Sequence, residues 1–174
     1  MKKIIAIAGS LKSNSSNQVI INTIAQLATG KFDVALYDGL AELPHFNPDL
    51  DSLVPPSAVM HMRTAIEQAD GVVICTPEYV FSIPSTLKNL IEWCVSTIVF
   101  SEKPTALITA SASGDKGHEE LQLLMQTLGA KLTPDTTILI KAIKGKVNQH
   151  GEINDAVTLQ AIEKLVNSFS YLVH

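Results

Sequence analysis

The sequence predicts an α/β protein with a doubly wound, parallel, five-stranded sheet and helices on both faces. Short apolar runs rich in β-branched residues alternate along the chain with longer segments whose apolar residues recur at helical spacing. Five such strand-and-helix units in succession are typical of a parallel sheet. With 174 residues, of which 46% are hydrophobic and 17% charged, the chain is long and apolar enough to bury a core. We therefore expect a single domain over residues 1–174.

The charge and the amino terminus exclude several classes of protein. A formal net charge of −4 is mild, so nothing indicates binding to nucleic acid or to an anionic membrane surface. The apolar run at residues 4–8 directly follows Met1-Lys2-Lys3, and it is too short for a signal peptide or a membrane span. Both cysteines fall inside predicted regular elements, as expected of free buried thiols in a reducing compartment. We therefore expect a cytoplasmic protein.

The first strand is expected over residues 4–8, and a loop of small hydroxyl and amide side chains follows at residues 9–17. The next helix presents one apolar face formed by Ile20, Ile24, Leu27 and Ala28. The loop side chains can simply cap this helix. Alternatively, together with the helix N-terminus, they form a site for a phosphate. Because a cap needs only one such residue, we favour the phosphate site.

The second strand is expected over residues 32–37. Residues 40–57 then show neither a helical nor a strand period, and they contain four prolines. A connection of this length either has a function, covers part of the protein, or is a solvated surface loop. The helix that follows is marked by Val59, Met62 and Ile66. Asp70-Gly71 is the expected stop signal of that helix.

The central strand is expected over residues 71–76, because an unbroken β-branched run suits a strand that is buried on both faces. Thr76-Pro77 ends it, since proline lacks a backbone donor and disfavours helix at the preceding residue. Pro84 lies in the expected first turn of the next helix, where its missing N–H is no loss. The apolar stripe of that helix is formed by Leu87, Leu90, Ile91, Cys94 and Val95.

The remaining elements repeat this pattern. Pro104 precedes an expected fourth strand over residues 105–110, and a second loop of small residues, 111–117, leads into a helix that Gly129 stops. A fifth strand is expected within residues 130–140. The apolar faces are formed by Leu121, Leu124 and Leu128 in the fourth helix, and by Ile162, Leu165, Val166 and Phe169 in the closing helix.

Three loops follow the carboxyl ends of strands, at residues 9–17, 76–82 and 111–117. In the strand order 2-1-3-4-5, the first and third strands are neighbours at the topological switch point, where open α/β sheets bind ligands. We expect a ligand with a phosphate on the first loop and a flat ring between the other two, beside the rings of Tyr79 and Phe81. A lone tyrosine is more often a packed surface ring, so Tyr79 alone decides little.

Other chemistries are excluded by spacing. The first loop has one glycine and no Gly-Lys-Ser/Thr sequence, so it is neither a dinucleotide fingerprint nor a Walker A loop. Neither cysteine begins the Cys-x-x-x-x-x-Arg loop of small tyrosine phosphatases, because phenylalanine stands at both arginine positions. The five histidines lack metal-ligand spacing, and no metal site is expected. His118, near the third loop, is expected to be a solvated residue at a helix start.

Two stretches carry a resemblance to a known family. Residues 9–17 match the pattern G-S-L-[RK]-x-x-S-x-N, and residues 76–93 match the longer and more specific T-P-E-Y-x-x-S-I-P-x-x-L-K-N-x-I-[DE]-W. Over nearly its whole length, the chain resembles the NADPH-dependent FMN reductases, a family of flavodoxin-like fold that includes quinone, chromate and azo reductases. The resemblance implies bound FMN, with NADPH or NADH as co-substrate.

The resemblance also implies which residues bind FMN. The phosphate would be held by Ser10, Lys12, Ser15, Ser16 and Asn17. The isoalloxazine ring would lie along Pro77, Glu78, Tyr79 and Val80, and the third loop would contribute Ser111 and Gly114. Three positions depart from the family's pattern: Lys12 replaces a common arginine, Val80 a frequent asparagine, and Ser85 a usual glycine or alanine.

The function implied by this resemblance is that of an FMN-dependent oxidoreductase, assembled as a homodimer or homotetramer. It would pass hydride from NADPH or NADH through FMN to a quinone or a similar small acceptor. Because the cofactor carries the chemistry, we nominate no catalytic side chain. Two alternatives remain: a flavodoxin-type electron carrier that docks on protein partners, a class typically much more acidic than this chain, and a flavin-free interaction module.

Overall fold

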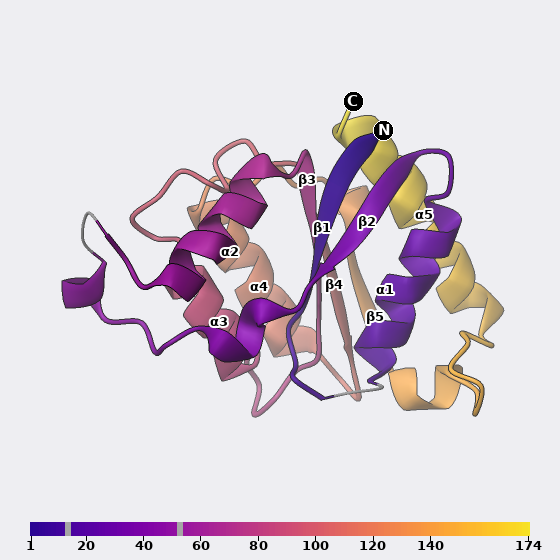
Figure 1. Ribbon diagram of the computed structural model, residues 1–174. Helices are drawn as coiled ribbons and strands as arrows, with labels where there is room; N and C mark the ends of the chain where they lie inside the picture. Colours follow the sequence, from indigo (N-terminus) through magenta and orange to yellow (C-terminus); the bar gives the residue numbers. More distant parts are fainter. Residues whose placement is uncertain (13–14, 52–53) are drawn as a thin grey trace.

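Five parallel strands form the centre of the protein. The computed structural model describes residues 1–12, 15–51 and 54–174. The strands are β1 (Lys2–Ala8), β2 (Phe32–Tyr37), β3 (Gly71–Thr76), β4 (Thr105–Ser111) and β5 (Thr137–Lys141). They pair in parallel in the order β2-β1-β3-β4-β5, which confirms the predicted sheet (Figure 1).

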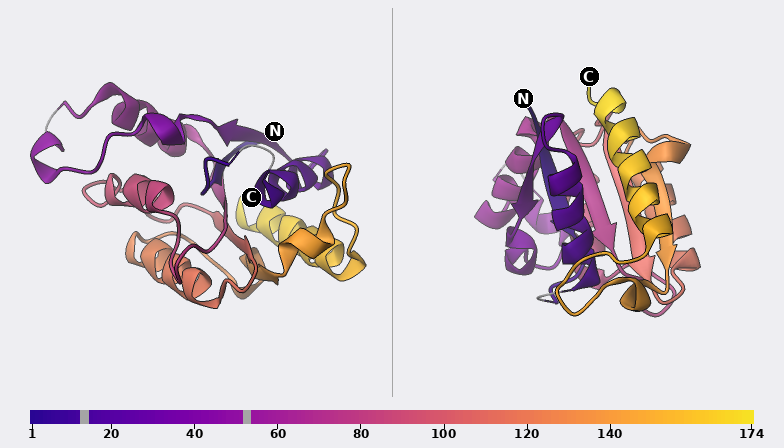
Figure 2. Two further views of the ribbon diagram at one scale, coloured as in Figure 1. Left: turned by 90° about the horizontal axis from the view of Figure 1, so that it is seen from below. Right: turned by 90° about the vertical axis from the view of Figure 1, so that its right-hand side faces the viewer.

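Helices cover both faces of this sheet, as predicted (Figure 1, Figure 2). On one face lie α1 (Ser16–Leu27) and α5 (Ala156–Leu172), and on the other lie α2 (Ser57–Gln68), α3 (Ser85–Glu92) and α4 (Asp115–Thr127). Short 3₁₀ turns add η1 (Gly39–Glu42), η2 (Pro48–Leu50), η3 (Pro134–Thr136) and η4 (Ile143–Lys146). In the three described ranges, no helix has the length and apolar character needed to cross a membrane.

The central strand β3 is buried at every position. Successive side chains of a strand point to opposite faces, so Val72 and Ile74 pack into the core beneath α2, α3 and α4. Val73 and Cys75 pack into the core beneath α1 and α5. Because both faces of β3 meet helices, the unbroken apolar run correctly predicts a doubly buried strand.

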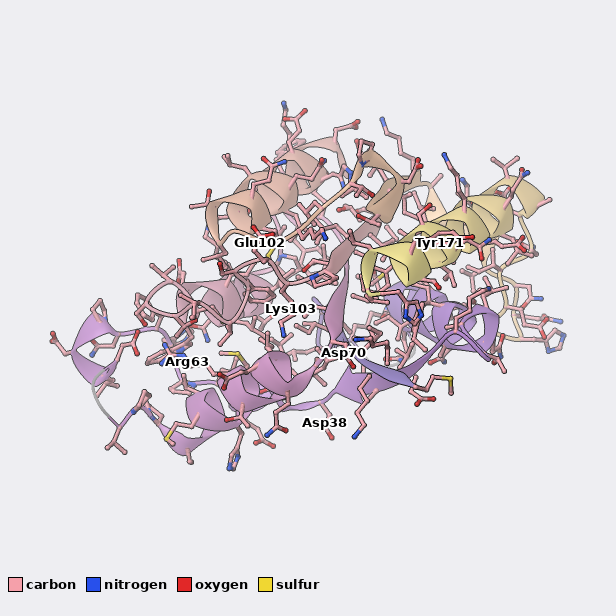
Figure 3. All side chains as sticks on the ribbon, turned by 90° about the horizontal axis from the view of Figure 1, so that it is seen from above. Asp38, Arg63, Asp70, Glu102, Lys103 and Tyr171 are labelled. Carbon is pink, nitrogen blue, oxygen red and sulfur yellow. The ribbon has the colours of Figure 1, made fainter. Side chains whose placement is uncertain are left out.

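The two edges of the sheet have different roles. All strands end at the lower edge in Figure 1, where the β1–α1, β3–α3 and β4–α4 connections and η4 gather, whereas both chain termini lie at the upper edge. Figure 3 shows this upper edge, with Asp70 and Lys103 near its middle. The Asp70 carboxylate accepts from the Lys3 N–H at 2.8 Å and from Lys2 Nζ at 3.0 Å. These bonds fix the start of β3 to the start of β1.

Gly71 differs from its predicted role as part of a helix stop signal. Helix α2 already ends at Gln68, and Gly71 is the first residue of β3, where it pairs with Ile4. A Cβ atom at this position would lie 2.9 Å from Cζ of Phe169 and 3.0 Å from the carbonyl oxygen of Pro104. Glycine is therefore required here by close packing against α5 and not by a left-handed cap.

The end of α3 also differs from the prediction. The helix stops at Glu92, and the chain continues as tighter turns with hydrogen bonds three residues apart. In these turns the Cys94 N–H donates to the Ile91 carbonyl, and the Val95 N–H donates to the Glu92 carbonyl. This change of pitch keeps Cys94 buried but leaves the Val95 side chain 63% exposed. Val95 is thus not part of the apolar stripe, because the helical spacing that predicts its burial ends before it.

The proline-rich segment 40–57 is attached to α3 where the structure describes it. Asn89 donates through Nδ2 to the carbonyl of Pro44 at 2.9 Å and accepts from the Phe46 N–H at 2.7 Å. The Trp93 indole N–H donates to the same Pro44 carbonyl at 2.8 Å, and its ring meets Phe46 edge to face at 5.1 Å. Asn89 and Trp93 belong to the second family pattern, so part of that pattern serves to hold this segment.

A second anchor lies further along the same segment. Arg63 of α2, marked in Figure 3, pairs with Asp51 at 2.9 Å and donates to the carbonyl of Trp93. Burial alone would raise the pKa of Asp51, but the hydrogen bonds from Ser96 and Arg63 outweigh burial and lower it. The segment is therefore held at residues 44–46 and at Asp51, whereas residues 47–50 between these two anchors are exposed to solvent.

Candidate active site

A cavity of about 800 Å³ lies at the carboxyl edge of the sheet. Its volume falls in the range of cofactor sites. The first loop and α1 contribute Ser10, Lys12, Ser15, Ser16 and Asn17, and the loop after β3 contributes Pro77 and Tyr79. The end of β4 contributes Ala110, Ser111 and Ala112, and the segment after β5 contributes Ala142, Ile143, Lys144 and Gly145. The cavity thus lies at the predicted switch point between β1 and β3.

Most of the predicted cofactor-binding residues line this cavity. They are Ser10, Lys12, Ser15, Ser16, Asn17, Pro77, Tyr79 and Ser111. Glu78, Val80 and Gly114 are not in the wall, and neither is Phe81, which was expected to flank a flat ring. Two residues of the predicted phosphate loop, Ser13 and Asn14, lie outside the described residues.

The N-terminus of α1 opens into the cavity. Ser15 caps the helix, since its Oγ accepts from the Gln18 N–H at 3.2 Å. The N–H groups of Ser16 and Asn17 are the first two of the helix, so they have no acceptor within it. Among the described residues, no other acceptor satisfies them. One serine thus caps the helix, and two free donors at its positive end remain for an anion.

Asn17 is the most informative residue of the wall. Its side chain is only 4% exposed, and its Oδ1 accepts from the Cys75 thiol at 3.2 Å. Burial raises the pKa of Cys75 far above its usual range, so the thiol stays protonated and keeps donating. Among the described residues, no side-chain nitrogen or oxygen atom is both buried and unpaired, so Nδ2 is not an orphaned donor. The Cys75 bond therefore leaves the amide NH₂ as a donor for a ligand.

Gly9 sets the position of the first loop against β3. Its N–H donates to the Cys75 carbonyl at 2.8 Å, and its own carbonyl accepts from the Thr86 hydroxyl at 3.2 Å. A Cβ atom here would lie 2.3 Å from Oγ1 of Thr76. Only glycine permits this approach, which brings the first loop next to the loop after β3.

Ser10 and Tyr79 join these two loops directly. Their hydroxyl oxygens are 3.0 Å apart, and Ser10 Oγ also accepts from the Lys12 N–H at 3.3 Å. A smaller cavity of about 290 Å³ shares Ser10, Lys12 and Tyr79 with the main one. Tyr79 is thus bound to the wall and is not an isolated surface ring.

The loop after β3 contains a tight hairpin. Tyr79 and Ser82 exchange backbone hydrogen bonds of 2.8 and 3.0 Å, and the two residues between them, Val80 and Phe81, have φ values of 51° and 59°. Two positive φ values define a type I′ turn, which normally contains asparagine and glycine. The Val80 and Phe81 side chains are 94% and 78% exposed. The expectation that Phe81 forms a wall is wrong, because this backbone turns it away from the cavity lining.

Two carboxylates hold this hairpin against α4. Glu78 accepts from the N–H groups of Gly114 at 3.1 Å and Gly117 at 2.8 Å, so it caps α4 from outside the helix. In return, Glu120 of α4 accepts from the Ser82 hydroxyl at 2.6 Å and pairs with Lys88 at 3.0 Å. Burial would raise the pKa of Glu120, but these bonds and one from the Ile83 N–H lower it. The Glu78 carboxylate thus positions the loop and is not in the wall.

His118 differs from the solvated residue that was expected. It is partly buried, and its Nδ1 lies 3.0 Å from the hydroxyl of Thr109, which is fully buried at the end of β4. Burial lowers the pKa of His118, against the opposing charge of Asp115. The imidazole is therefore mainly neutral at pH 7 and packs beneath the third loop.

Sequence reasoning missed the fourth side of the cavity. The segment Ala142 to Gly145 follows β5, and the carboxyl ends of all parallel strands meet at one edge, so this loop could have been included with the other three. The sequence does not reveal the backbone conformation of Ala142, which has a φ of 54° and donates its N–H to the Ala112 carbonyl at 3.1 Å. That conformation brings η4 to the cavity.

The residues present fit a flavin mononucleotide. The N–H groups of Ser16 and Asn17, the NH₂ group of Asn17 and Lys12 give one part of the wall donors that suit an anion. Pro77, Tyr79 and Ala110 give another part that suits a planar ring. The cavity therefore offers donors for one phosphate and an apolar wall for one ring system.

Comparisons with known proteins agree with this geometry. Residues 2–143 match the model of the NADPH-dependent FMN reductases. A quinone reductase of Escherichia coli is 28% identical, and the alignment covers 98% of this chain and 95% of the relative. An NAD(P)H-dependent FMN reductase of Pseudomonas aeruginosa is 36% identical over 72% of this chain and 69% of the relative. A solved flavoenzyme, the NAD(P)H:acceptor oxidoreductase FerB of Paracoccus denitrificans, superposes with a TM-score of 0.80 at 25% identity, covering 99% of this chain and 97% of that one.

Proposed function

This chain belongs to the NADPH-dependent FMN reductase family, and on that premise we propose that it reduces a quinone or a similar small acceptor, using NADPH or NADH and bound FMN. The names of two relatives support this acceptor and this donor, since one is a quinone reductase and the other an NAD(P)H-dependent FMN reductase. The proposal assigns the cavity at the carboxyl edge to FMN.

One observation carries the assignment of the cavity. Asn17 lies in the cavity wall at the N-terminus of α1, and because its Oδ1 accepts from the Cys75 thiol, its NH₂ group is the end of the amide that can donate to a ligand. An amide NH₂ group beside the first N–H groups of a helix favours a ligand that offers several acceptor atoms. A phosphate monoester supplies several strong acceptor oxygens, and its negative charge is favoured at a helix N-terminus.

The protein's own residues position and shield the reacting groups. The phosphate would be held by Ser10, Lys12, Ser16 and Asn17, and Pro77, Tyr79 and Ser111 would flank the ring. The Ser10–Tyr79 hydrogen bond holds the first loop against the loop after β3. Bound FMN supplies the hydride chemistry, since its ring accepts a hydride and passes electrons on. Glu78 and Glu120 hold the hairpin beside the ring site, so that little of the loop has to reorganise on binding.

The order of substrate binding tests the enzyme assignment. A ring that lies against the carboxyl edge leaves one face open, so the nicotinamide and the acceptor must use this face in turn. We expect ping-pong kinetics, with parallel double-reciprocal lines when quinone is varied at several NADPH concentrations. Anaerobic mixing with NADPH should also bleach the flavin within one turnover time. A flavin that stays oxidised until a separate reductase is added would identify an electron carrier instead.

The identity of the flavin has its own test. We propose FMN over FAD, because the donors at α1 suit one phosphate and the sequence has no dinucleotide fingerprint. Hydrogen bonds to charged groups contribute roughly 1.5–3 kcal/mol each. Changing Ser10 and Asn17 together to alanine should therefore weaken FMN binding by more than about tenfold. An unchanged dissociation constant in a fluorescence titration would rule out this phosphate site.

We also propose a cytoplasmic location and a homodimer or homotetramer. Cys75 and Cys94 are both free and buried, which is usual in a reducing compartment. Exposed apolar side chains occur on α2, at Met60, and just beyond α3, at Val95 and Ile98. Contact with a second chain would cover these apolar side chains. Light scattering should give a multiple of 18.8 kDa, and a monomer at all concentrations would contradict the assembly.

A further inference from the structure

The cavity wall is cationic. It contains two lysines, Lys12 and Lys144, and within the described residues it contains no aspartate or glutamate. Lys12 belongs to the family's phosphate loop, whereas Lys144 comes from η4, just beyond the last residue that the family model matches. Neither lysine forms an ion pair with any carboxylate in the described ranges. Lys144 therefore has no structural partner that explains its position.

The neighbouring lysines are different. Lys141 pairs with Asp115 at 2.7 Å, and Lys146 pairs with Asp155 at 3.7 Å. Both of these side chains have a partner in the fold, and neither lines the cavity. Of the lysines in this short segment, Lys144 alone combines a place in the described cavity wall with an unpaired charge.

The backbone fixes Lys144 near the N-terminus of α1. Ala142 is held to Ala112 by a 3.1 Å hydrogen bond, and the next side chain, Ile143, is buried in the core that includes Ile20 and Ile24 of α1. In Figure 1, η4 lies below the first turn of α1, at the same edge of the sheet. Lys144 therefore lines the same cavity as Ser15, Ser16 and Asn17 at the N-terminus of α1.

We propose that Lys144 is a specificity-determining residue that contacts the phosphate of FMN and favours FMN over the dephosphorylated flavin, riboflavin. This inference rests on the proposed function. A phosphate monoester carries a charge of about −1.5 to −2 at pH 7. Lys12 is a point charge where related proteins often have arginine, which binds a phosphate through two hydrogen bonds. A second positive charge from η4 would compensate for the weaker binding of the phosphate by a lysine at position 12.

The experiment compares two ligands that differ only in the phosphate. Flavin-free full-length protein is titrated with FMN and with riboflavin, and the dissociation constants are obtained from flavin fluorescence. The variants are Lys144→Ala and Lys144→Arg. Lys146→Ala is the matched control, because Lys146 lies in the same 3₁₀ turn but pairs with Asp155 outside the cavity wall. Each titration is repeated at several salt concentrations.

The proposal predicts a change for one ligand only. Lys144→Ala should weaken FMN binding by about tenfold, a typical effect for a charge-assisted hydrogen bond, and should leave riboflavin binding within about twofold. The FMN dissociation constant of this variant should also respond less steeply to salt, since one screened charge is gone. Lys144→Arg should keep the preference for FMN, and Lys146→Ala should resemble the unchanged protein.

Three other results would overturn the proposal. Equal affinity of Lys144→Ala and the unchanged protein for FMN would show that Lys144 does not contact the phosphate. Equal weakening of FMN and riboflavin would show that it acts through the fold. A higher KM for NADPH but not NADH, with FMN affinity unchanged, would assign Lys144 to the nucleotide's extra phosphate. If the unchanged protein binds neither flavin, the proposed function itself fails, which is a distinct outcome.

Discussion

Removing the Glu78 carboxylate tests whether α4 depends on a cap from outside the helix. Glu78→Ala removes the acceptor for the N–H groups of Gly114 and Gly117, and Gly114, at the N-cap position, has no side chain to replace it. Loss of a helix cap costs about 0.5–2 kcal/mol, and hydrogen bonds to charged groups lie at the upper end of such effects. For a partly buried carboxylate with two such bonds, we expect a loss of about 2 kcal/mol in the free energy of unfolding.

Urea denaturation measures this loss. With an m value of about 2 kcal/mol/M, the unfolding midpoint should fall by about 1 M in Glu78→Ala. Glu78→Gln keeps one acceptor oxygen and should lose about half as much. The control is Glu119→Ala in the first turns of the same helix, where the carboxylate is 64% exposed and pairs only with Lys116. Such pairs contribute less than about 1 kcal/mol. A midpoint for Glu78→Ala no lower than that of Glu119→Ala would refute the reasoning.

Three further predictions concern the thiols, the histidine and the proline-rich segment. Cys75→Ala should weaken FMN binding a few-fold through Asn17, and Cys75→Ser should restore it. Burial raises the pKa of Cys94 to about 12, so Cys94→Ala should leave flavin binding and turnover within a few-fold. Burial lowers the pKa of His118, so the unfolded chain binds a proton more readily than the folded protein, and the free energy of unfolding should fall as the pH drops below about 6.5. In urea titrations at several pH values, His118→Gln should make this fall less steep. An equally steep fall in the variant would contradict the assignment to His118. Asn89→Ala removes two hydrogen bonds to residues 44–46 and should speed protease cleavage between residues 44 and 51. An unchanged cleavage rate would show that the Trp93 hydrogen bond alone holds this segment in place.

Much of the fold is predictable from local pattern. The strand at residues 32–37 has the predicted bounds, and the run at 71–76 is buried as its composition indicates. The same holds for the first loop, where Ser15 caps a helix and Asn17 enters the cavity. These features follow from neighbouring residues, so a single sequence contains the information for them.

The features that sequence reasoning missed depend on contacts between distant residues. The Glu78 carboxylate reaches an N–H group 36 positions later in the chain, and no local pattern indicates that helix as its partner. Ala142 is not a residue that signals a left-handed backbone, so the approach of η4 to the cavity is invisible in the sequence. Val95 illustrates a third limit, because helical spacing predicts burial only as far as the helix continues.

The hairpin tip formed by Val80 and Phe81 has a consequence for how this protein evolves. Both residues adopt a left-handed backbone conformation, which costs roughly 1–2 kcal/mol for residues of this kind, and neither lines the described cavity. The conformation of this turn therefore contributes to stability at two positions whose side chains are outside the described cavity wall. Asparagine at position 80 or glycine at position 81 would release that free energy and leave the cavity wall unchanged. A lineage that accumulates destabilising substitutions elsewhere can thus regain stability at this turn, and the same two positions give protein engineers a place to add stability without redesigning the site.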